Sequence, residues 1–335
     1  MGSILLVDCS RCGKKPSYYT RRYSGESLCA ACFQETTVEK VARTISKYGM
    51  LHRGERVGVA VSGGKDSLSL LKILHELNGG ARSEAKGELV ALTVDEGVSG
   101  YRDEAIEHAR AVCDELGVEH VVVSYSGLFG FSLDQALDWK DDRELTSCSM
   151  CGVFRRRAID EAAVKAKVDV VATAHNLDDY VQTFMMNLLH GDVERLAWLD
   201  PSTYDENFPV RRVKPLTEVY EEEVALYAYI SKIPFQSASC PYMHEGLRSE
   251  VRDYLNELEA KHPGMKNVLL RSSLEVSSRL SKAGRDDDAS AKATVPCARC
   301  GKPSSKGVCG VCRMTEIVWQ HAKVLDRNGN IHTIQ

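Results

Sequence analysis

The sequence has no long hydrophobic run, and none of its apolar stretches reaches the roughly 18 residues that a membrane-spanning helix needs. The amino terminus also lacks the basic segment with which a secretory signal peptide begins. We therefore expect no membrane association and a cytoplasmic location. Hydrophobic residues nevertheless make up 43% of the 335 residues, which is typical of a folded, soluble protein.

An excess of positive charge is also missing. The chain has 43 Lys and Arg against 47 Asp and Glu, for a net charge of −4. A polyanionic partner would therefore have to be held by a local basic surface and not by the field of the whole protein. Short basic runs occur at Arg155–Arg157, at Arg211, Arg212 and Lys214, and at Arg248 with Arg252. Taken alone, each run is more typical of a solvated face or a structural ion pair.

Cysteine, in contrast, is abundant, with 12 residues that include five C-x-x-C pairs. In a chain without an export signal this spacing indicates metal binding and not disulfides. Two groups of four have the spacing of zinc knuckles, namely Cys9, Cys12, Cys29 and Cys32 near the amino terminus, and Cys297, Cys300, Cys309 and Cys312 near the carboxyl terminus. We predict one structural Zn²⁺ in each group, because four thiolates close a tetrahedral shell.

A third group of cysteines has a different pattern. Cys148 and Cys151 lie just ahead of a predicted helix, and Cys240 stands alone before a proline. Three thiolates suit a [4Fe–4S] cluster with one iron free of protein ligation. A redox disulfide between Cys148 and Cys151, or a third zinc site completed by a histidine such as His244, fits the spacing as well. The remaining Cys113 lies on the apolar face of a predicted helix, so we expect it in the core.

The most informative stretch is the hydroxyl-rich loop Ser62–Ser67, which reads S-G-G-K-D-S. It follows the apolar run Val57–Val61, a predicted strand, and precedes an apolar helical pattern. Glycines let the main chain approach a phosphate closely, and the N–H groups at a helix start bind anions. The loop is not a Walker A sequence, since Val59 replaces its first glycine and Asp66 its Ser or Thr. We expect a phosphate-binding loop of another kind.

Strands and helices alternate from about residue 55 to residue 200. The pattern predicts strands at 56–61, 89–94, 119–124 and 168–173, and helices at 66–78, 102–117, 151–166 and 178–189. This alternation predicts an α/β fold with a doubly wound parallel sheet and a nucleotide at the carboxyl ends of its strands. A further helix is expected at 36–50, capped by Thr36 or Thr37, and residues 217–282 are expected to be mainly helical.

Several motifs together resemble one family, the tRNA 2-thiouridine synthetases, which are N-type ATP pyrophosphatases with an adenine nucleotide α-hydrolase-like fold. The resemblance is carried by Ala60–Ser67, Val94–Gly97, Gly100–Asp103, Cys148–Arg156, Ala174–Asp179, Arg212–Pro215 and Cys240–Tyr242. It covers essentially the whole chain. The likeness is closest to the archaeal and eukaryotic cytoplasmic group that thiolates wobble uridine 34, while a related group with the same architecture thiolates T-loop uridine 54.

The resemblance implies an ATP-dependent reaction on a tRNA uridine. The C2 oxygen attacks the α-phosphate of ATP, pyrophosphate leaves, and sulfur then replaces the adenylated oxygen as AMP departs. The implied ATP-binding residues, with Mg²⁺ beside the pyrophosphate, are Ala60, Val61, Ser62, Gly63, Gly64, Lys65, Asp66, Ser67, Val94, Arg155, Ala174 and Asp179. Main-chain groups of Ala60, Ser62 and Val94 are expected to hold adenosine.

The catalytic residues implied by the resemblance are Asp179, Arg155, Cys148, Cys151 and Cys240. Arg155 is suited to the α-phosphate and its developing charge. Asp179 would serve as metal ligand or acid/base group, although an aspartate beside Asp178 at a helix start also has a capping explanation. The three cysteines match cluster ligands, so that the free iron would bind sulfide. A competing mechanism uses a persulfide pair of Cys148 and Cys240 without a cluster.

The implied organisation is an amino-terminal four-cysteine zinc module at 1–35, a catalytic domain at 36–280 with the iron–sulfur site and a helical carboxyl-terminal part, a linker at 281–294, and a second four-cysteine zinc module with a tail at 295–335. The implied partners are tRNA, a sulfur donor that is a ubiquitin-like thiocarboxylate carrier or free sulfide, and a second copy in a homodimer.

Two other functions are compatible with parts of the sequence. A different N-type ATP pyrophosphatase, such as an amide-forming synthetase, would explain the loop but has no use for the three separate cysteines. A non-enzymatic zinc-ribbon RNA-binding protein would explain the two knuckles. The intact Lys65, Asp66, Ser67 and Asp179 argue against that second alternative.

Overall fold

The computed structural model describes residues 7–14, 16–79, 87–139, 146–197, 199, 201, 210–243, 246–287, 295–304 and 307–325. Predicted features at His244, at 288–294 in the linker and at 326–335 in the tail lie outside these residues. Among the described helices, none combines the length and the apolar character that crossing a membrane requires.

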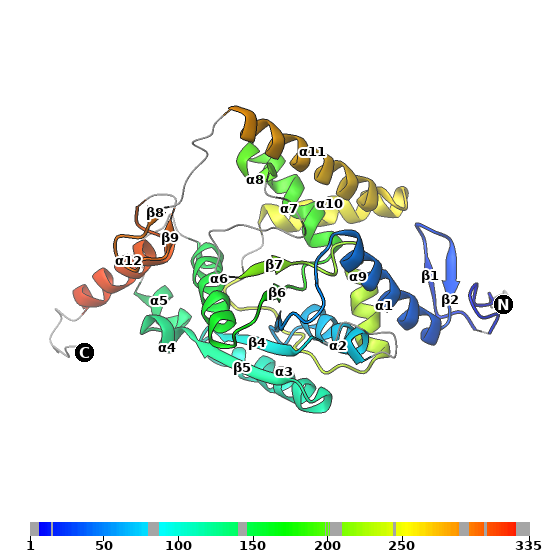
Figure 1. The fold of residues 1–335 in the computed structure, drawn as a ribbon, viewed down its shortest axis with the longest axis horizontal. Helices are drawn as coiled ribbons and strands as arrows, with labels where there is room; N and C mark the ends of the chain where they lie inside the picture. The colour runs from blue at the N-terminus through cyan, green and yellow to red at the C-terminus, as the bar shows by residue number, and fades with distance from the viewer. Residues whose placement is uncertain are drawn as a thin grey trace.

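A five-stranded parallel sheet forms the centre of the molecule (Figure 1). Its strands are β3 (Val57–Ala60), β4 (Leu89–Asp95), β5 (Glu119–Ser124), β6 (Val170–Ala172) and β7 (Arg211–Val213), in the order β5-β4-β3-β6-β7. All neighbouring pairs are parallel, which confirms the predicted doubly wound sheet. The strand order reverses between β3 and β6, and ligands of such sheets bind beside this switch point.

Helices cover both faces of the sheet, and alternate strand residues point to each. On one face Ala91 packs in a core with α1 (Ala30–Lys47), α2 (Lys65–Gly79), α3 (Arg102–Leu116) and α9 (Glu221–Ile230). On the other face Leu92 packs in a core with α4 (Tyr125–Phe129), α5 (Leu133–Asp138), α6 (Ser147–Lys165) and α12 (Gly310–Leu325). This period of two follows from the pleat of a strand.

A separate helical layer lies beyond β6 and β7, at the top of Figure 1. It consists of α7 (Leu177–Leu189), α8 (Val193–Ala197), α10 (Leu247–Lys261) and α11 (Met265–Asp287), which share a third apolar core. The helical character predicted for 217–282 is confirmed. Helix α11 continues to Asp287, so residues 281–287 of the predicted linker are helical; they contain no proline, and Gly284 is their one glycine.

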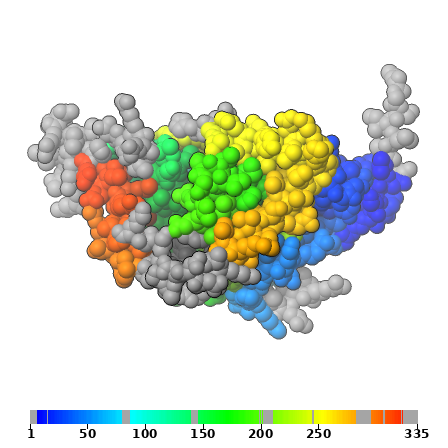
Figure 2. Space-filling view, turned by 90° about the horizontal axis from the view of Figure 1, so that it is seen from above, coloured from blue at the N-terminus to red at the C-terminus, as the bar shows by residue number. Residues whose placement is uncertain are grey.

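The two cysteine-rich modules lie at opposite ends of the molecule (Figures 1 and 2). The amino-terminal one contains the hairpin of β1 (Tyr19–Arg21) and β2 (Glu26–Leu28), and the carboxyl-terminal one contains β8 (Val295–Pro296) and β9 (Pro303–Ser304). The second module is anchored on the sheet domain by Trp319, whose ring lies 6.0 Å from that of Phe131 and 5.8 Å from that of Trp139.

Two predicted helix starts are wrong. Helix α6 begins at Ser147 and not at 151, because the Thr146 hydroxyl accepts the Ser149 N–H (3.2 Å) and caps the helix earlier. Cys148 and Cys151 therefore lie within the helix. Helix α1 begins at Ala30, inside the first module and across the predicted boundary at 35. Thr36 and Thr37 do not cap it, since both hydroxyls donate to the Phe33 carbonyl within the helix.

Candidate active site

The loop after β3 is closed on itself and needs a glycine. Gly63 has a φ of +83°, and a Cβ atom there would collide with the Ala105 carbonyl of α3. The Ser67 hydroxyl accepts the Ser62 N–H (3.1 Å) and donates to the Gly64 carbonyl (3.0 Å). Helix α2 begins at Lys65, so the N–H groups of its first turn have no intrahelical acceptor. The loop therefore presents main-chain donors in the crevice at the switch point.

Lys65 and Asp66 place one cation and one carboxylate at this helix start. The Lys65 Nζ lies 2.9 Å from Asp66 Oδ2 and 2.9 Å from Glu221 Oε1. Burial raises the pKa of Asp66, and the charge of Lys65 opposes this rise. The Oδ1 atom of Asp66 is buried and has no hydrogen-bond partner among the described residues. An unsatisfied buried carboxylate oxygen beside a phosphate loop fits a Mg²⁺ ligand.

The other predicted nucleotide-binding residues of this strand have different environments. Ala60 ends β3 and is partly exposed. Val61 is buried, and both of its main-chain groups are hydrogen-bonded. Its N–H donates to the Leu92 carbonyl (2.8 Å), and its carbonyl accepts from the Thr93 hydroxyl (3.0 Å). Val61 therefore supports the loop from within the core.

Asp179 lies on the opposite side of the switch point, in the first turn of α7. Its carboxylate accepts the Asn176 N–H (3.2 Å), and the Asn176 side chain accepts the Asp179 N–H (3.0 Å), which forms a capping box. Ala174 lies in the loop between β6 and this box. Desolvation raises the pKa of Asp179, and the charge of Asp179 in turn contributes to the raised pKa of Asp66. The two carboxylates therefore lie close enough for their charges to interact.

A chain of ion pairs connects the phosphate loop to the cysteines. Arg102 donates to the main-chain carbonyls of Ser62 (2.9 Å) and Val94 (2.6 Å). Its Nε lies 2.6 Å from Glu96 Oε2, while the other oxygen of Glu96 accepts from Arg155 Nε (2.8 Å). The Arg155 Nη2 then lies 3.3 Å from the Cys151 sulfur. Arg155 thus lies between the loop and the third cysteine group.

The three separate cysteines lie in one region. Cys151 is 8% exposed and lies within 3.6 Å of the Tyr125 hydroxyl. The Cys148 sulfur lies 3.9 Å from the carbonyl oxygen of Tyr242, two residues beyond Cys240. Burial raises the pKa of Cys151, and the charge of Cys240 adds to this effect. The three sulfur atoms are not as compact as the zinc-type groups, since among the described residues only the two four-cysteine sets have all ligand atoms within 4.8 Å of one another.

Those two sets fit structural zinc. The structure brings the four sulfur atoms of each set within 4.8 Å of one another, for Cys9, Cys12, Cys29 and Cys32 and for Cys297, Cys300, Cys309 and Cys312. A main-chain N–H of Cys29 lowers the pKa of the Cys9 thiol to about 6, and one of Cys309 lowers that of Cys297 to about 6. Within the same sets, burial raises the pKa of Cys32 to about 12 and also raises that of Cys312. Cys113 is fully buried, as predicted, and burial raises its pKa to about 12.

Three residues of the site had no assigned role from the sequence. Glu96 and Arg102 lie within recognised motifs, but their ion pair was not foreseen. Glu221 belongs to the acidic run Glu221–Glu223, to which the sequence pattern assigns no role. The position of Glu96 in the sequence could have indicated its role. It directly follows β4, at the carboxyl edge of the sheet where ligand-binding residues collect.

The comparisons with known proteins agree with this geometry. Residues 34–258 match the family model described as PP-loop domain. The chain therefore belongs to the PP-loop class of nucleotide-binding proteins.

Its relatives narrow this class. The chain is 34% identical over 310 residues to cytoplasmic tRNA 2-thiolation protein 1 of Xenopus laevis, covering 92% of this chain and 88% of that protein. It is 33% identical over 331 residues to tRNA 2-thiolation protein NcsA of Haloferax volcanii, covering 93% and 99%. The solved structure of the U34-tRNA thiolase NcsA from Methanococcus maripaludis with its [4Fe–4S] cluster superposes with a TM-score of 0.71 at 36% identity, over 81% of this chain and 88% of that one. The chain belongs to the tRNA 2-thiolation protein family.

Proposed function

We propose that this protein is an ATP-dependent tRNA uridine 2-sulfurtransferase that modifies wobble uridine 34. The observation that carries the proposal is the ion-pair chain from the Ser62 carbonyl through Arg102, Glu96 and Arg155 to Cys151. It joins a nucleotide loop and a thiol site in one centre, which neither another ATP pyrophosphatase nor an RNA-binding scaffold requires.

The first step activates the uridine. The C2 oxygen forms a bond to the α-phosphorus of ATP, and the bond from that phosphorus to the bridging oxygen breaks to release pyrophosphate. Lys65 and the N–H groups at the start of α2 neutralise the departing pyrophosphate, and Asp66 would hold Mg²⁺ there through its unpaired oxygen. Arg155 stabilises the charge on the α-phosphate from the other side. Asp179, across the crevice, serves as a second metal ligand or as the acid/base group.

The second step exchanges oxygen for sulfur at C2. Sulfide forms a bond to C2, and the bond from C2 to oxygen breaks, so that oxygen leaves with AMP. Cys148, Cys151 and Cys240 would hold a [4Fe–4S] cluster, which supplies an iron without a protein ligand to bind that sulfide. The guanidinium of Arg155, 3.3 Å from the Cys151 sulfur, offsets the negative charge that gathers there.

The remaining assignments belong to the same proposal. The two four-cysteine sets each hold one Zn²⁺ as a structural ion. The protein works in the cytoplasm, as a homodimer, on tRNA, with sulfur from a ubiquitin-like thiocarboxylate carrier or from free sulfide. A size measurement in solution and a comparison of the two donors in a thiolation assay test these last two assignments.

The direct test uses protein purified without oxygen, ATP, Mg²⁺ and sulfide. The substrates are two unmodified tRNA transcripts that differ only by uridine or cytidine at position 34, and the products are digested to nucleosides for mass spectrometry. We expect 2-thiouridine from the first transcript alone. Equal thiolation of both transcripts would indicate uridine 54, and no thiouridine from either would refute the proposal.

A further inference from the structure

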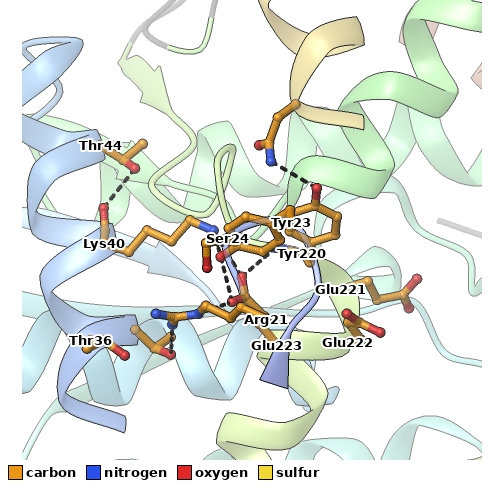
Figure 3. Close-up of polar contacts among 12 residues, drawn as sticks. Arg21, Tyr23, Ser24, Thr36, Lys40, Thr44, Tyr220, Glu221, Glu222 and Glu223 are labelled. Atoms are coloured by element: carbon orange, nitrogen blue, oxygen red, sulfur yellow. Dashed lines mark hydrogen bonds and ion pairs between the residues drawn. The ribbon is translucent and has the colours of Figure 1, made fainter. Parts of the chain in front are cut away.

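A fully buried carboxylate connects the amino-terminal cysteine module to the phosphate loop. Glu223, in the first turn of α9, is 0% exposed. One of its oxygens accepts from Arg21 Nε (2.6 Å) and from the Tyr23 hydroxyl (2.9 Å). The other accepts from Lys40 Nζ (3.0 Å) and from the Tyr220 N–H (3.3 Å). Figure 3 shows these side chains around Glu223.

The donors come from segments far apart in the sequence. Arg21 and Tyr23 belong to β1 and its turn, which form part of the cysteine module, and Lys40 belongs to α1. The rings of Tyr23 and Tyr220 stack at 4.9 Å, and the Lys40 ammonium lies 4.7 Å from the centre of the Tyr23 ring. The paired cations lower the pKa of Glu223 despite its burial, so that it remains ionised. The start of α9 is therefore held firmly against the module.

This helix start is also in contact with the reaction centre. Glu221, two residues before Glu223, accepts from Lys65 Nζ at 2.9 Å. Its N–H donates to Asp178 Oδ2 (2.8 Å), and the other oxygen of Asp178 pairs with Lys266. Lys65 and Tyr23 line the same cavity of about 380 Å³. The position of the Lys65 side chain thus depends on the position of the first turn of α9.

We propose that Glu223 is a positioning residue for ATP: held by Arg21, Tyr23 and Lys40, it fixes the first turn of α9, so that Glu221 aligns Lys65 with the pyrophosphate. The amino-terminal module thereby takes part in nucleotide binding without contacting the nucleotide. This inference rests on the proposed role of Lys65 in the function above.

The test measures ATP affinity of the full chain by calorimetric titration with Mg²⁺. Glu223→Gln keeps the shape of the side chain but removes the buried charge that Arg21 and Lys40 share, and we expect the Kd for ATP to rise about tenfold. The matched control is Glu55→Gln, which breaks a partly buried pair with Arg211 (2.7 Å) at the amino edge of the sheet. We expect this control to lower thermal stability and to change the Kd by less than about twofold.

A double-mutant cycle separates positioning from a general loss of structure. In a Lys65→Ala background Glu223→Gln should have little further effect on the Kd, because both act through one contact. An unchanged Kd in Glu223→Gln, or a full additional loss in the Lys65→Ala background, would overturn the inference. If Glu223→Gln does not fold, Tyr23→Phe serves instead, because it removes one donor to the Glu223 carboxylate. An unchanged Kd for ATP in Tyr23→Phe would equally overturn the inference. A wild-type chain that does not bind ATP would instead refute the proposed function, and this inference with it.

Discussion

Individual side chains in this site have two roles at once. Asp179 closes a capping box, and the proposed reaction also uses it as a metal ligand or acid/base group. Arg155 pairs with Glu96 and also lies against the Cys151 sulfur. A substitution that keeps one role and removes the other is therefore more informative than truncation to alanine.

Asp179→Asn separates capping from catalysis. An asparagine oxygen can still accept the Asn176 N–H, so we expect stability to stay within about 0.5 kcal/mol of wild type, whereas Asp179→Ala should lose about 1 kcal/mol. Both variants should thiolate tRNA about 100-fold more slowly. Melting curves and thiouridine yields measure the two effects. Wild-type yield from Asp179→Asn would reduce this residue to a helix cap.

Arg155→Lys tests whether the reaction needs a guanidinium that contacts Glu96 and Cys151 at the same time. A lysine keeps the charge but cannot contact Glu96 and Cys151 together, so we expect pyrophosphate release to slow about tenfold while ATP affinity is kept. Arg156→Lys, on the neighbouring exposed position, is the matched control and should react at the wild-type rate. Equal rates for the two variants would remove Arg155 from the activation step.

At the level of helices and strands, α6 is the element on which the centre depends. It carries Cys148, Cys151 and Arg155, and it also contacts α12 of the carboxyl-terminal module. Arg157 of this helix lies 4.0 Å from the Cys300 sulfur and 3.9 Å from the Cys309 sulfur. One helix therefore connects the second zinc-type set to the thiol site.

Arg157→Met should weaken the hold on zinc in the carboxyl-terminal set only. Neighbours of metal ligands tune affinity, and we expect zinc release to a chelator to become about tenfold easier. The amino-terminal set provides an internal control, because Arg157 contacts none of its cysteines in the described structure. Two zinc ions released with wild-type affinities would contradict this role.

The sequence predicted the elements that a long pattern of neighbouring residues marks, and it missed those that a single side chain, a very short segment or a distant partner decides. The Ser62–Ser67 loop and α2 follow from neighbouring residues, so both were predicted almost to the residue. The start of α6 was missed because a single threonine cap decides it. The strand β7 was missed because only three residues, two of them arginines, form it. The pairing of Glu96 with Arg155, 59 positions apart, exists only once the sheet has formed.

Across the whole molecule, twelve cysteines divide into two closed sets, one open trio and one core residue. The wild-type chain purified without oxygen should contain about four iron atoms, and Cys240→Ala should lose them while still binding ATP. Cys113→Ala, a core substitution, is the control and should keep its iron. Full iron in Cys240→Ala would refute the ligand assignment. Thiolation by iron-free wild type would favour the persulfide pair of Cys148 and Cys240.

The most direct test follows pyrophosphate and 2-thiouridine together in one anaerobic reaction with tRNA, ATP and sulfide. If both halves of the crevice act on one uridine, wild type forms the two products in equal amounts and Lys65→Ala forms neither. Cys240→Ala should release pyrophosphate in the presence of tRNA without forming thiouridine. Thiouridine made by Cys240→Ala at the wild-type rate, or made without ATP, would contradict a shared centre.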